Sequence, residues 1–262
     1  MIKLGSDFSD VSKKVIWSLF DSETAITQQL NSDDYIVYSI GLPSSSALTD
    51  NFIKMDLSRR SCLKKLDKLP PPDIIFASPP CETWVTVNSG NLRFYNRTGN
   101  EYNLYWKNNF KGNDYGLHHR SLRLTGQRTA YFTAEIIKKF NPELWCIENG
   151  YTSLIFKYLH TYLGLNGYKN LTYYDNYNAL DFSLKPTYIF SNKKLLLNKN
   201  KNKNKNRITL SRSLSDKIKK QIIKNGFLAI KSTYAERSAV PIELYRHILE
   251  IYEGKHQLEL FT

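Results

Sequence analysis

The feature that most constrains this chain is a short apolar run that ends in two prolines and a cysteine. Residues 74–77 (Ile-Ile-Phe-Ala) are continuously hydrophobic, and Ser78-Pro79-Pro80-Cys81 follows them directly. A continuous apolar run is typical of a central parallel strand that is covered on both faces. Each proline fixes φ at about −65° and removes a backbone donor, so the chain leaves the sheet as a stiff loop. We therefore expect the Cys81 thiol at the carboxyl edge of the sheet, where open α/β sheets bind ligands.

A second segment repeats this pattern further along the chain. Residues 143–150 read Glu-Leu-Trp-Cys-Ile-Glu-Asn-Gly, an apolar strand that ends in Glu148 and Asn149. A thiol and a carboxylate at the ends of two such strands can converge on one pocket. The alternative for Cys81 is a buried structural cysteine beside a turn. The second segment favours a catalytic role.

Together, Ser78-Pro79-Pro80-Cys81 and Glu148-Asn149, in this order, resemble the catalytic motifs of the DNA cytosine-5 methyltransferases. The most similar members are the short, phage-like and mobile-element enzymes, which carry a Lys-Pro-Thr segment late in the chain, here at 185–187. The resemblance covers nearly the whole chain, although only the Pro-Pro-Cys and Glu-Asn motifs are specific. It implies that Cys81 is the nucleophile and that Glu148 acts on the base. The implied substrate-binding residues are Ser78, Pro79, Pro80 and Asn149.

The chemistry of the family explains why it needs these residue types. Cytosine C5 is a poor carbon nucleophile until a thiolate adds to C6, and Cys81 would supply that thiolate. A cysteine thiol has a pKa of about 8.5, so it must be activated by its surroundings or by concerted proton movement. Glu148 would protonate or hydrogen-bond N3 of the base, which has to be flipped out of the duplex at a cost of roughly a few kcal/mol. Amino-group methyltransferases place an aromatic residue after the two prolines, and cysteine at position 81 argues against them.

The resemblance implies S-adenosylmethionine as the cofactor. In the family a Phe-x-Gly-x-Gly loop follows the first strand, which is predicted here at 15–20. Phe20 is kept, but Ser22 and Thr24 replace the glycines, which let the backbone approach the ligand. The second strand, 35–40, ends in Gly41 where an acidic residue would hold the ribose hydroxyls. Asp56, after a third strand at 52–55, matches the acidic contact to the adenine amino group, or else caps a helix that starts near residue 58.

Residues 236–241 (Glu-Arg-Ser-Ala-Val-Pro) resemble the closing motif of the family, which folds back beside the cofactor. They open a predicted helix at 241–252, with its proline in the first turn. No metal ligands are expected. The candidate cofactor-binding residues are Phe20, Asp21, Ser22, Thr24, Asp56, Ser238 and Val240.

The segment 85–117 is longer than the compact family requires, and it mixes aromatic residues with Arg and Lys. Such a mixture suits stacking on bases and contact with phosphates. The alternative is an ordered loop with a small core of its own. The target-recognition domain of larger members is missing or reduced here, because few residues lie between 191 and 236, so we expect sequence readout to rest on this segment. The candidate DNA contacts are Arg93, Arg97, Tyr105, Trp106, Lys107 and Lys111.

The charge of the chain points to a polyanionic partner. Its 37 Lys and Arg residues exceed its 24 Asp and Glu residues, and the net charge of +13 favours nucleic acid over a small acidic substrate. Biased codon usage is the alternative explanation. Three cysteines without metal-ligand or disulfide spacing indicate a reducing cytoplasm, and we expect association with the nucleoid. No apolar run approaches about 18 residues and no signal-peptide core is present, so neither a membrane span nor secretion is expected.

The segment Gln257-Leu258-Glu259-Leu260-Phe261 is similar to the pentapeptide by which bacterial proteins dock on the replication sliding clamp. In that motif two apolar anchors, Leu260 and Phe261, enter a preformed pocket, while Gln257 and Leu258 fix the register. The resemblance implies the clamp as a partner. A packed or frayed tail is the alternative, because chance matches to short motifs are common.

The sequence thus predicts a doubly wound, mostly parallel seven-stranded α/β sheet of the S-adenosylmethionine-dependent methyltransferase type at 1–252, followed by a tail at 253–262. Further helices are predicted at 125–140 and 151–163. Residues 198–206 alternate Lys and Asn, which indicates a flexible solvated loop. We expect a monomer that methylates C5 of cytosine in double-stranded DNA. The alternatives are a catalytically degenerate relative that binds DNA or the clamp, and an RNA cytosine-5 methyltransferase.

Overall fold

The computed structural model describes the sheet and most of the helices that surround it. The described residues are 13–21, 26–42, 51–81, 83–84, 113–177, 185–199 and 240–255 of the 262 in the chain. Several predicted features lie outside these ranges: Ser22, Thr24 and Ser238 of the cofactor set, the segment 85–112 with all six candidate DNA contacts, most of the Lys/Asn-rich loop, and the clamp-like segment 257–261.

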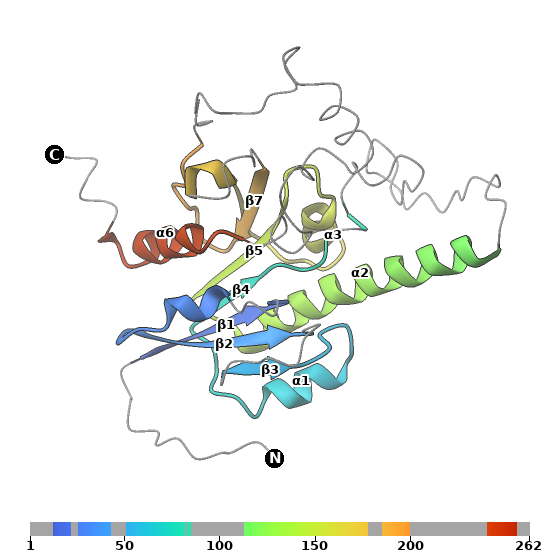
Figure 1. The fold of residues 1–262 in the computed structure, drawn as a ribbon, viewed down its shortest axis with the longest axis horizontal. Coiled ribbons are helices and arrows are strands. Elements are labelled where there is room, and N and C mark those ends of the chain that lie inside the picture. The colour runs from blue at the N-terminus through green and yellow to red at the C-terminus, as the bar shows by residue number, and fades with distance from the viewer. Residues whose placement is uncertain are drawn as a thin grey trace, which may run out of the picture.

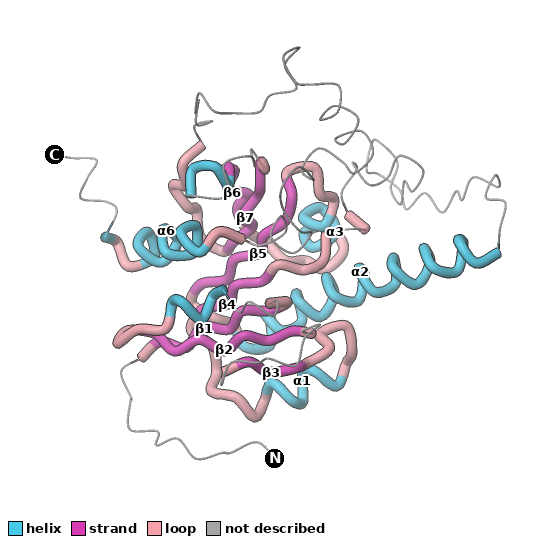
Figure 2. Tube along the Cα trace, viewed as in Figure 1, coloured by secondary structure: helices cyan, strands magenta, loops and turns pink. Residues whose placement is uncertain are grey.

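Seven strands form one sheet in the order β3-β2-β1-β4-β5-β7-β6 (Figures 1 and 2). Neighbouring strands are parallel, except that β7 runs antiparallel to both β5 and β6. This is the doubly wound, mostly parallel sheet of the S-adenosylmethionine-dependent methyltransferase fold, as the sequence predicts. The strands are β1 (Lys14–Leu19), β2 (Tyr35–Gly41), β3 (Phe52–Lys54), β4 (Ile74–Ala77), β5 (Leu144–Gly150), β6 (Tyr168–Tyr173) and β7 (Pro186–Ser191).

The central strands bury both of their faces, because successive side chains point to opposite sides of the sheet. In β4, Ile75 and Ala77 join one core, whereas Ile74 and Phe76 join the other. The first core also contains residues of three helices, α1 (Ser61–Leu66), α2 (Asn113–Phe140) and α3 (Ile155–Thr161). The second contains residues of α6 (Ile242–Tyr252) and of two 3-10 helices, η1 (Ile26–Leu30) and η3 (Tyr174–Tyr177). This explains why the run at 74–77 is continuously apolar.

Three predicted helix boundaries are wrong. α2 begins at Asn113 rather than 125, so the last five residues of the predicted insert are helical, and Figure 1 shows this end of α2 extending past the sheet. The apolar periodicity detects only the part of a helix that packs on a core, which here is its second half. α3 covers 155–161 rather than 151–163, because the chain first makes a turn in which the Ser153 N–H donates to the Gly150 carbonyl over 2.8 Å. Pro241 precedes α6 as its N-cap rather than lying in its first turn.

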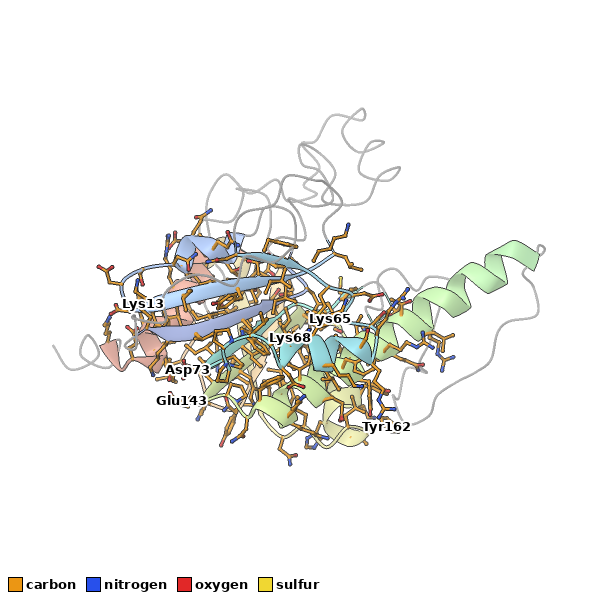
Figure 3. The ribbon with its side chains drawn as sticks, turned by 90° about the horizontal axis from the view of Figure 1, so that it is seen from below. Lys13, Lys65, Lys68, Asp73, Glu143 and Tyr162 are labelled. Atoms are coloured by element: carbon orange, nitrogen blue, oxygen red, sulfur yellow. The ribbon has the colours of Figure 1, made fainter. Side chains whose placement is uncertain are left out.

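The amino ends of the central strands are tied to the end of α6. Lys13, Asp73 and Glu143, which stand before β1, β4 and β5, lie toward the same end of the sheet (Figure 3). Lys14 Nζ lies 3.1 Å from Glu143 Oε2, and the Tyr252 hydroxyl at the end of α6 also donates to Glu143. In the described part of the chain, no helix is long and apolar enough to cross a membrane.

Gly41, at the end of β2, is needed for close packing against the end of β1. A Cβ atom at this position would lie 2.3 Å from the Asp21 carbonyl oxygen, a separation that real Cβ atoms essentially never show. The Asp21 N–H also donates to the Ile40 carbonyl over 3.2 Å, which holds the two chain segments together. The position where the family has an acidic side chain is therefore closed by backbone in this protein.

We expect Gly41→Ala to lower the free energy of unfolding by about 1–3 kcal/mol, because an added methyl group in a filled site forces the backbone to move. Urea denaturation followed by circular dichroism measures the change. The neighbouring Leu42 is exposed, so Leu42→Ala is a control that should change stability by less than about 0.5 kcal/mol. A Gly41→Ala protein as stable as the wild type would show that the Asp21 backbone can move away.

Candidate active site

The parallel pairing of β4 and β5 brings the two sequence motifs together. Ala77 pairs with Ile147 across the two strands, so Ser78 leaves β4 beside Glu148. Both strands point toward the same edge of the sheet, the edge at which ligands bind in this class of fold. The prediction that the Pro-Pro-Cys and Glu-Asn motifs share one edge is confirmed.

The loop that carries Cys81 is held to the sheet at both ends. The Ser78 N–H donates to the Leu19 carbonyl of β1 over 3.2 Å, and Asn149 Nδ2 donates to the Pro79 carbonyl over 2.9 Å. On the far side of the cysteine, the Trp84 N–H donates to the Cys81 carbonyl over 2.9 Å. Asn149 thus positions the loop through its amide nitrogen. Among the described residues, its buried Oδ1 accepts no hydrogen bond, which leaves one acceptor for a further partner.

The loop also packs closely against α2. A Cβ atom at Gly126 would lie 2.0 Å from Thr83 Oγ1, so glycine lets the helix approach the residues after Cys81. Trp84 is buried, its ring lies 5.1 Å from that of Tyr158 in α3, and its carbonyl accepts from the Leu154 N–H over 3.1 Å. These contacts could not be predicted from the sequence, because Gly126 lies far along the chain from Thr83, within an otherwise ordinary helical segment.

Exposure separates the three cysteines. Cys62 and Cys146 are buried, and this burial raises their thiol pKa values, to about 11 for Cys62. A thiol of raised pKa supplies little thiolate at neutral pH. Cys81 is partly exposed at the sheet edge, and none of the three cysteines forms a disulfide. Cys81 is therefore the cysteine placed to act as a nucleophile.

Glu148 is buried and has two partners that the sequence did not assign. The Tyr174 hydroxyl donates to Glu148 Oε1 over 2.7 Å, and Lys185 Nζ lies 3.9 Å from the same oxygen. Burial, followed by the nearby Glu148 carboxyl group, raises the pKa of Tyr174 well above its usual value, so this phenol stays protonated. Lys185 belongs to the Lys-Pro-Thr segment noted in the sequence, whereas nothing in the sequence singled out Tyr174.

α6 contacts the site from the second core. Its Tyr245 is buried, the ring lies 4.5 Å from that of Phe76, and the hydroxyl lies 3.3 Å from Ser78 Oγ. Burial raises the Tyr245 pKa, so this group is a neutral phenol. This contact holds Ser78, the first residue of the Cys81 loop, against the second core. Ser78 is therefore engaged by the protein itself, and Pro80 is the exposed proline of the pair.

Of the candidate cofactor residues that the structure describes, Phe20 and Asp21 follow β1, and Asp56 follows β3. Phe20 turns the chain after β1 with a φ of 63°, and Asp21 Oδ2 accepts a hydrogen bond from the buried Thr27 hydroxyl of η1. Thr27 Oγ1 also lies 3.3 Å from Ser39 Oγ of β2. Val240 is buried in the core formed with α6. The site of Asp21 is thus built from β1, β2 and η1.

Asp56 caps a turn rather than a helix. Its Oδ1 accepts from the Ser58 N–H and hydroxyl at 2.9 and 2.6 Å, and its Oδ2 accepts from Arg59 Nε at 2.8 Å. Burial acts to raise its pKa, but these hydrogen bonds outweigh it, and the pKa is lowered. α1 begins only at Ser61, with Arg60 at its N-cap, so the helix-cap alternative is wrong. Oδ2 keeps a lone pair for an amino group, and these residues fit the adenine end of S-adenosylmethionine.

No protein-family model matches the chain, and no curated protein matches it. Among the solved structures that are similar to it are three methyltransferases. The first is a putative DNA modification methyltransferase encoded within an E. coli prophage, with 13% identity over 68% of this chain and 46% of that one and a TM-score of 0.36. The second is the Entamoeba histolytica methyltransferase EhMeth, with 11% identity over 72% of this chain and 57% of that one and a TM-score of 0.41. The third is the Dnmt2 methyltransferase of S. pombe, with 13% identity over 70% of this chain and 51% of that one and a TM-score of 0.38. The chain spans about half the length of these proteins. The assignment of the methyltransferase fold rests on the strand order and on the antiparallel β7 of the sheet itself.

Proposed function

We propose that this protein transfers a methyl group to C5 of cytosine in DNA through a covalent adduct with Cys81. The observation that carries the proposal is that the loop with the partly exposed Cys81 leaves β4 at the edge of the sheet where Glu148 and Asn149 end the neighbouring parallel strand β5, and that Asn149 holds this loop through the Pro79 carbonyl. The order of the motifs in the sequence supports the same chemistry. The net charge of +13 supports a nucleic-acid substrate.

In this proposal the Cys81 thiolate forms a bond to C6, and the electron pair of the C5–C6 double bond moves to C5. Glu148 stabilises the adduct by giving a proton or a hydrogen bond to N3. Asn149 Oδ1 supplies an acceptor for the cytosine amino group, while its Nδ2 holds the loop of the nucleophile. Once C5 has bonded the transferred methyl group, loss of the C5 proton, expulsion of the thiolate and return of any proton on N3 would restore the aromatic ring.

Bound S-adenosylmethionine would supply the electrophilic methyl group. The residues proposed to hold it are Asp56 at the adenine amino group, and Phe20, Asp21, Ser22 and Thr24 in the loop after β1, with Ser238 and Val240 from the closing motif. Duplex DNA is the proposed partner, from which the target base is flipped. The sliding clamp is a second proposed partner, through residues 257–261.

S-adenosylmethionine should bind with a dissociation constant between about 1 μM and 1 mM, the usual range for enzyme ligands. Asp56→Asn should weaken binding by about tenfold or more, because it removes a charged acceptor. Isothermal titration calorimetry measures both values. Asp67→Asn is the control, since this exposed carboxylate is paired with Lys139 on the outside of the fold. Absence of heat with millimolar ligand would favour the non-catalytic alternative.

Cys81 should form a stable covalent adduct with duplex DNA that contains 5-fluorocytosine, because fluorine at C5 blocks the elimination that releases the enzyme. Mass spectrometry of the digested complex locates the modified residue. Cys81→Ser should abolish the adduct, whereas Cys62→Ser and Cys146→Ser should retain it wherever these variants fold. A cross-link on Cys62 or Cys146 would contradict the assignment, and faster reaction with a matched RNA would make RNA the substrate.

Glu148→Gln should lower the rate of methyl transfer by roughly 10²–10⁴-fold, the usual worth of a positioned acid, while leaving DNA affinity largely unchanged. Single-turnover kinetics and a DNA-binding titration separate the two effects. Glu143→Gln is a matched control at the other end of β5, where the carboxylate pairs with Lys14. Equal losses of affinity and rate would identify Glu148 as a structural residue.

A further inference from the structure

The side chains of Lys185, Tyr174 and Glu148, which are far apart in the sequence, form a hydrogen-bonded row. The Tyr174 hydroxyl donates to Glu148 Oε1 over 2.7 Å, and Lys185 Nζ donates to the Tyr174 oxygen over 3.4 Å. Lys185 Nζ also lies 4.4 Å from the centre of the Tyr174 ring, a cation–π contact. Tyr174 is 2% exposed, so its hydroxyl interacts with protein groups rather than with solvent, and Thr187 and Tyr245 also lie near it.

The backbone holds the row in place. Tyr174 opens η3 directly after β6, and its N–H donates to the Lys185 carbonyl over 3.3 Å. Lys185 directly precedes β7, whose Ile189 pairs with Glu148 on β5. Figure 1 shows β7 beside β5. The relative positions of the three side chains are therefore fixed by the sheet.

The inventory of donors and acceptors determines where the protons lie. A lysine ammonium group can only donate, so the Tyr174 oxygen accepts from Lys185. The single hydroxyl hydrogen of Tyr174 is then directed to Glu148, and Oε1 acts as an acceptor. In the arrangement in which the Tyr174 hydroxyl donates to Oε1, a proton carried by Glu148 is on Oε2.

We propose that Tyr174 and Lys185 are positioning residues that confine the reactive proton of Glu148 to Oε2 and so aim it at N3 of the target base. The inference rests on the proposed function, because it assigns the orientation of the acid in that reaction. It also gives Lys185 of the Lys-Pro-Thr segment a role, that of orienting the phenol. Without the Tyr174 hydroxyl, either oxygen of Glu148 can carry the proton and the carboxyl group can rotate.

The test measures release of tritium from C5 of cytosine in duplex DNA, without any methyl donor. In that reaction the Cys81 thiolate adds to C6 while N3 gains a proton, and C5 then takes a proton from water. Loss of the C5 tritium, expulsion of the thiolate and return of the N3 proton to Glu148 restore the base. Tyr174→Phe should lower the maximal rate by about 10- to 100-fold, the usual effect of a misplaced reacting group, with little change in KM for DNA.

Tyr177→Phe is the matched control, because Tyr177 lies in the same 3-10 helix and is also buried, but its hydroxyl contacts Thr172 and His247 Nδ1 instead, at 3.3 and 3.0 Å. This variant should keep the wild-type rate. Lys185→Met should lower the rate about as much as Tyr174→Phe does, whereas Lys185→Arg should retain most of the activity. The double variant Tyr174→Phe/Lys185→Met should be no slower than either single variant, because both residues act through Glu148.

Thermal denaturation of each variant separates a loss of folding from a loss of rate. Equal rates for Tyr174→Phe and Tyr177→Phe, or additive losses in the double variant, would overturn this inference and leave the proposed function standing. No tritium release by the wild-type protein, with DNA or RNA, would overturn both.

Discussion

The pairing of β4 with β5 is the constraint on which the candidate site depends. Because Ala77 lies opposite Ile147, the loop of Cys81 starts beside Glu148. Because side chains alternate along a strand, Glu148 and Asn149 point to opposite faces of the sheet. Glu148 points to the face of Cys146 and reaches Tyr174 and Lys185, whereas Asn149 reaches the Pro79 carbonyl. Two adjacent residues thus have different partners because a strand turns them to opposite faces of the sheet.

Much of this arrangement could be predicted from the sequence, because the continuous apolar runs before Ser78 and Glu148 indicate buried parallel strands and therefore a shared edge. The partners of Glu148 could not. Tyr174 and Lys185 come from the β6–β7 pair and Tyr245 from α6, and their approach depends on the antiparallel insertion of β7 between β5 and β6. A tyrosine among other tyrosines carries no local signal of such a contact. The start of α2 was missed for a related reason, since periodicity reports only the packed part of a helix.

The structure gives a physical reason for glycine at position 41, where the family pattern predicts an acidic residue. The sequence alone suggests that an acidic residue has been lost from the end of β2. In the structure the Asp21 backbone occupies the space that any side chain at position 41 would need, while the Asp21 carboxylate is held by Thr27. Residues 21 and 41 therefore pack as one unit, and the carboxylate beside the end of β2 comes from the segment that follows β1.

The loop of Cys81 has little freedom to move independently of the elements around it. It is fixed by Leu19 of β1, by Asn149 of β5 and by Tyr245 of α6, and Thr83 is packed against Gly126 of α2. In the proposed reaction, a thiol on a loop held in this way would already be placed when the base arrives, which would reduce the entropy that must be lost on reaching the transition state. The same contacts join the loop to both cores of the sheet. A shift of α2 along the sheet would therefore be transmitted through Thr83 to the backbone of Cys81, so the packed half of this helix would contribute to the geometry of the proposed reaction without touching the substrate.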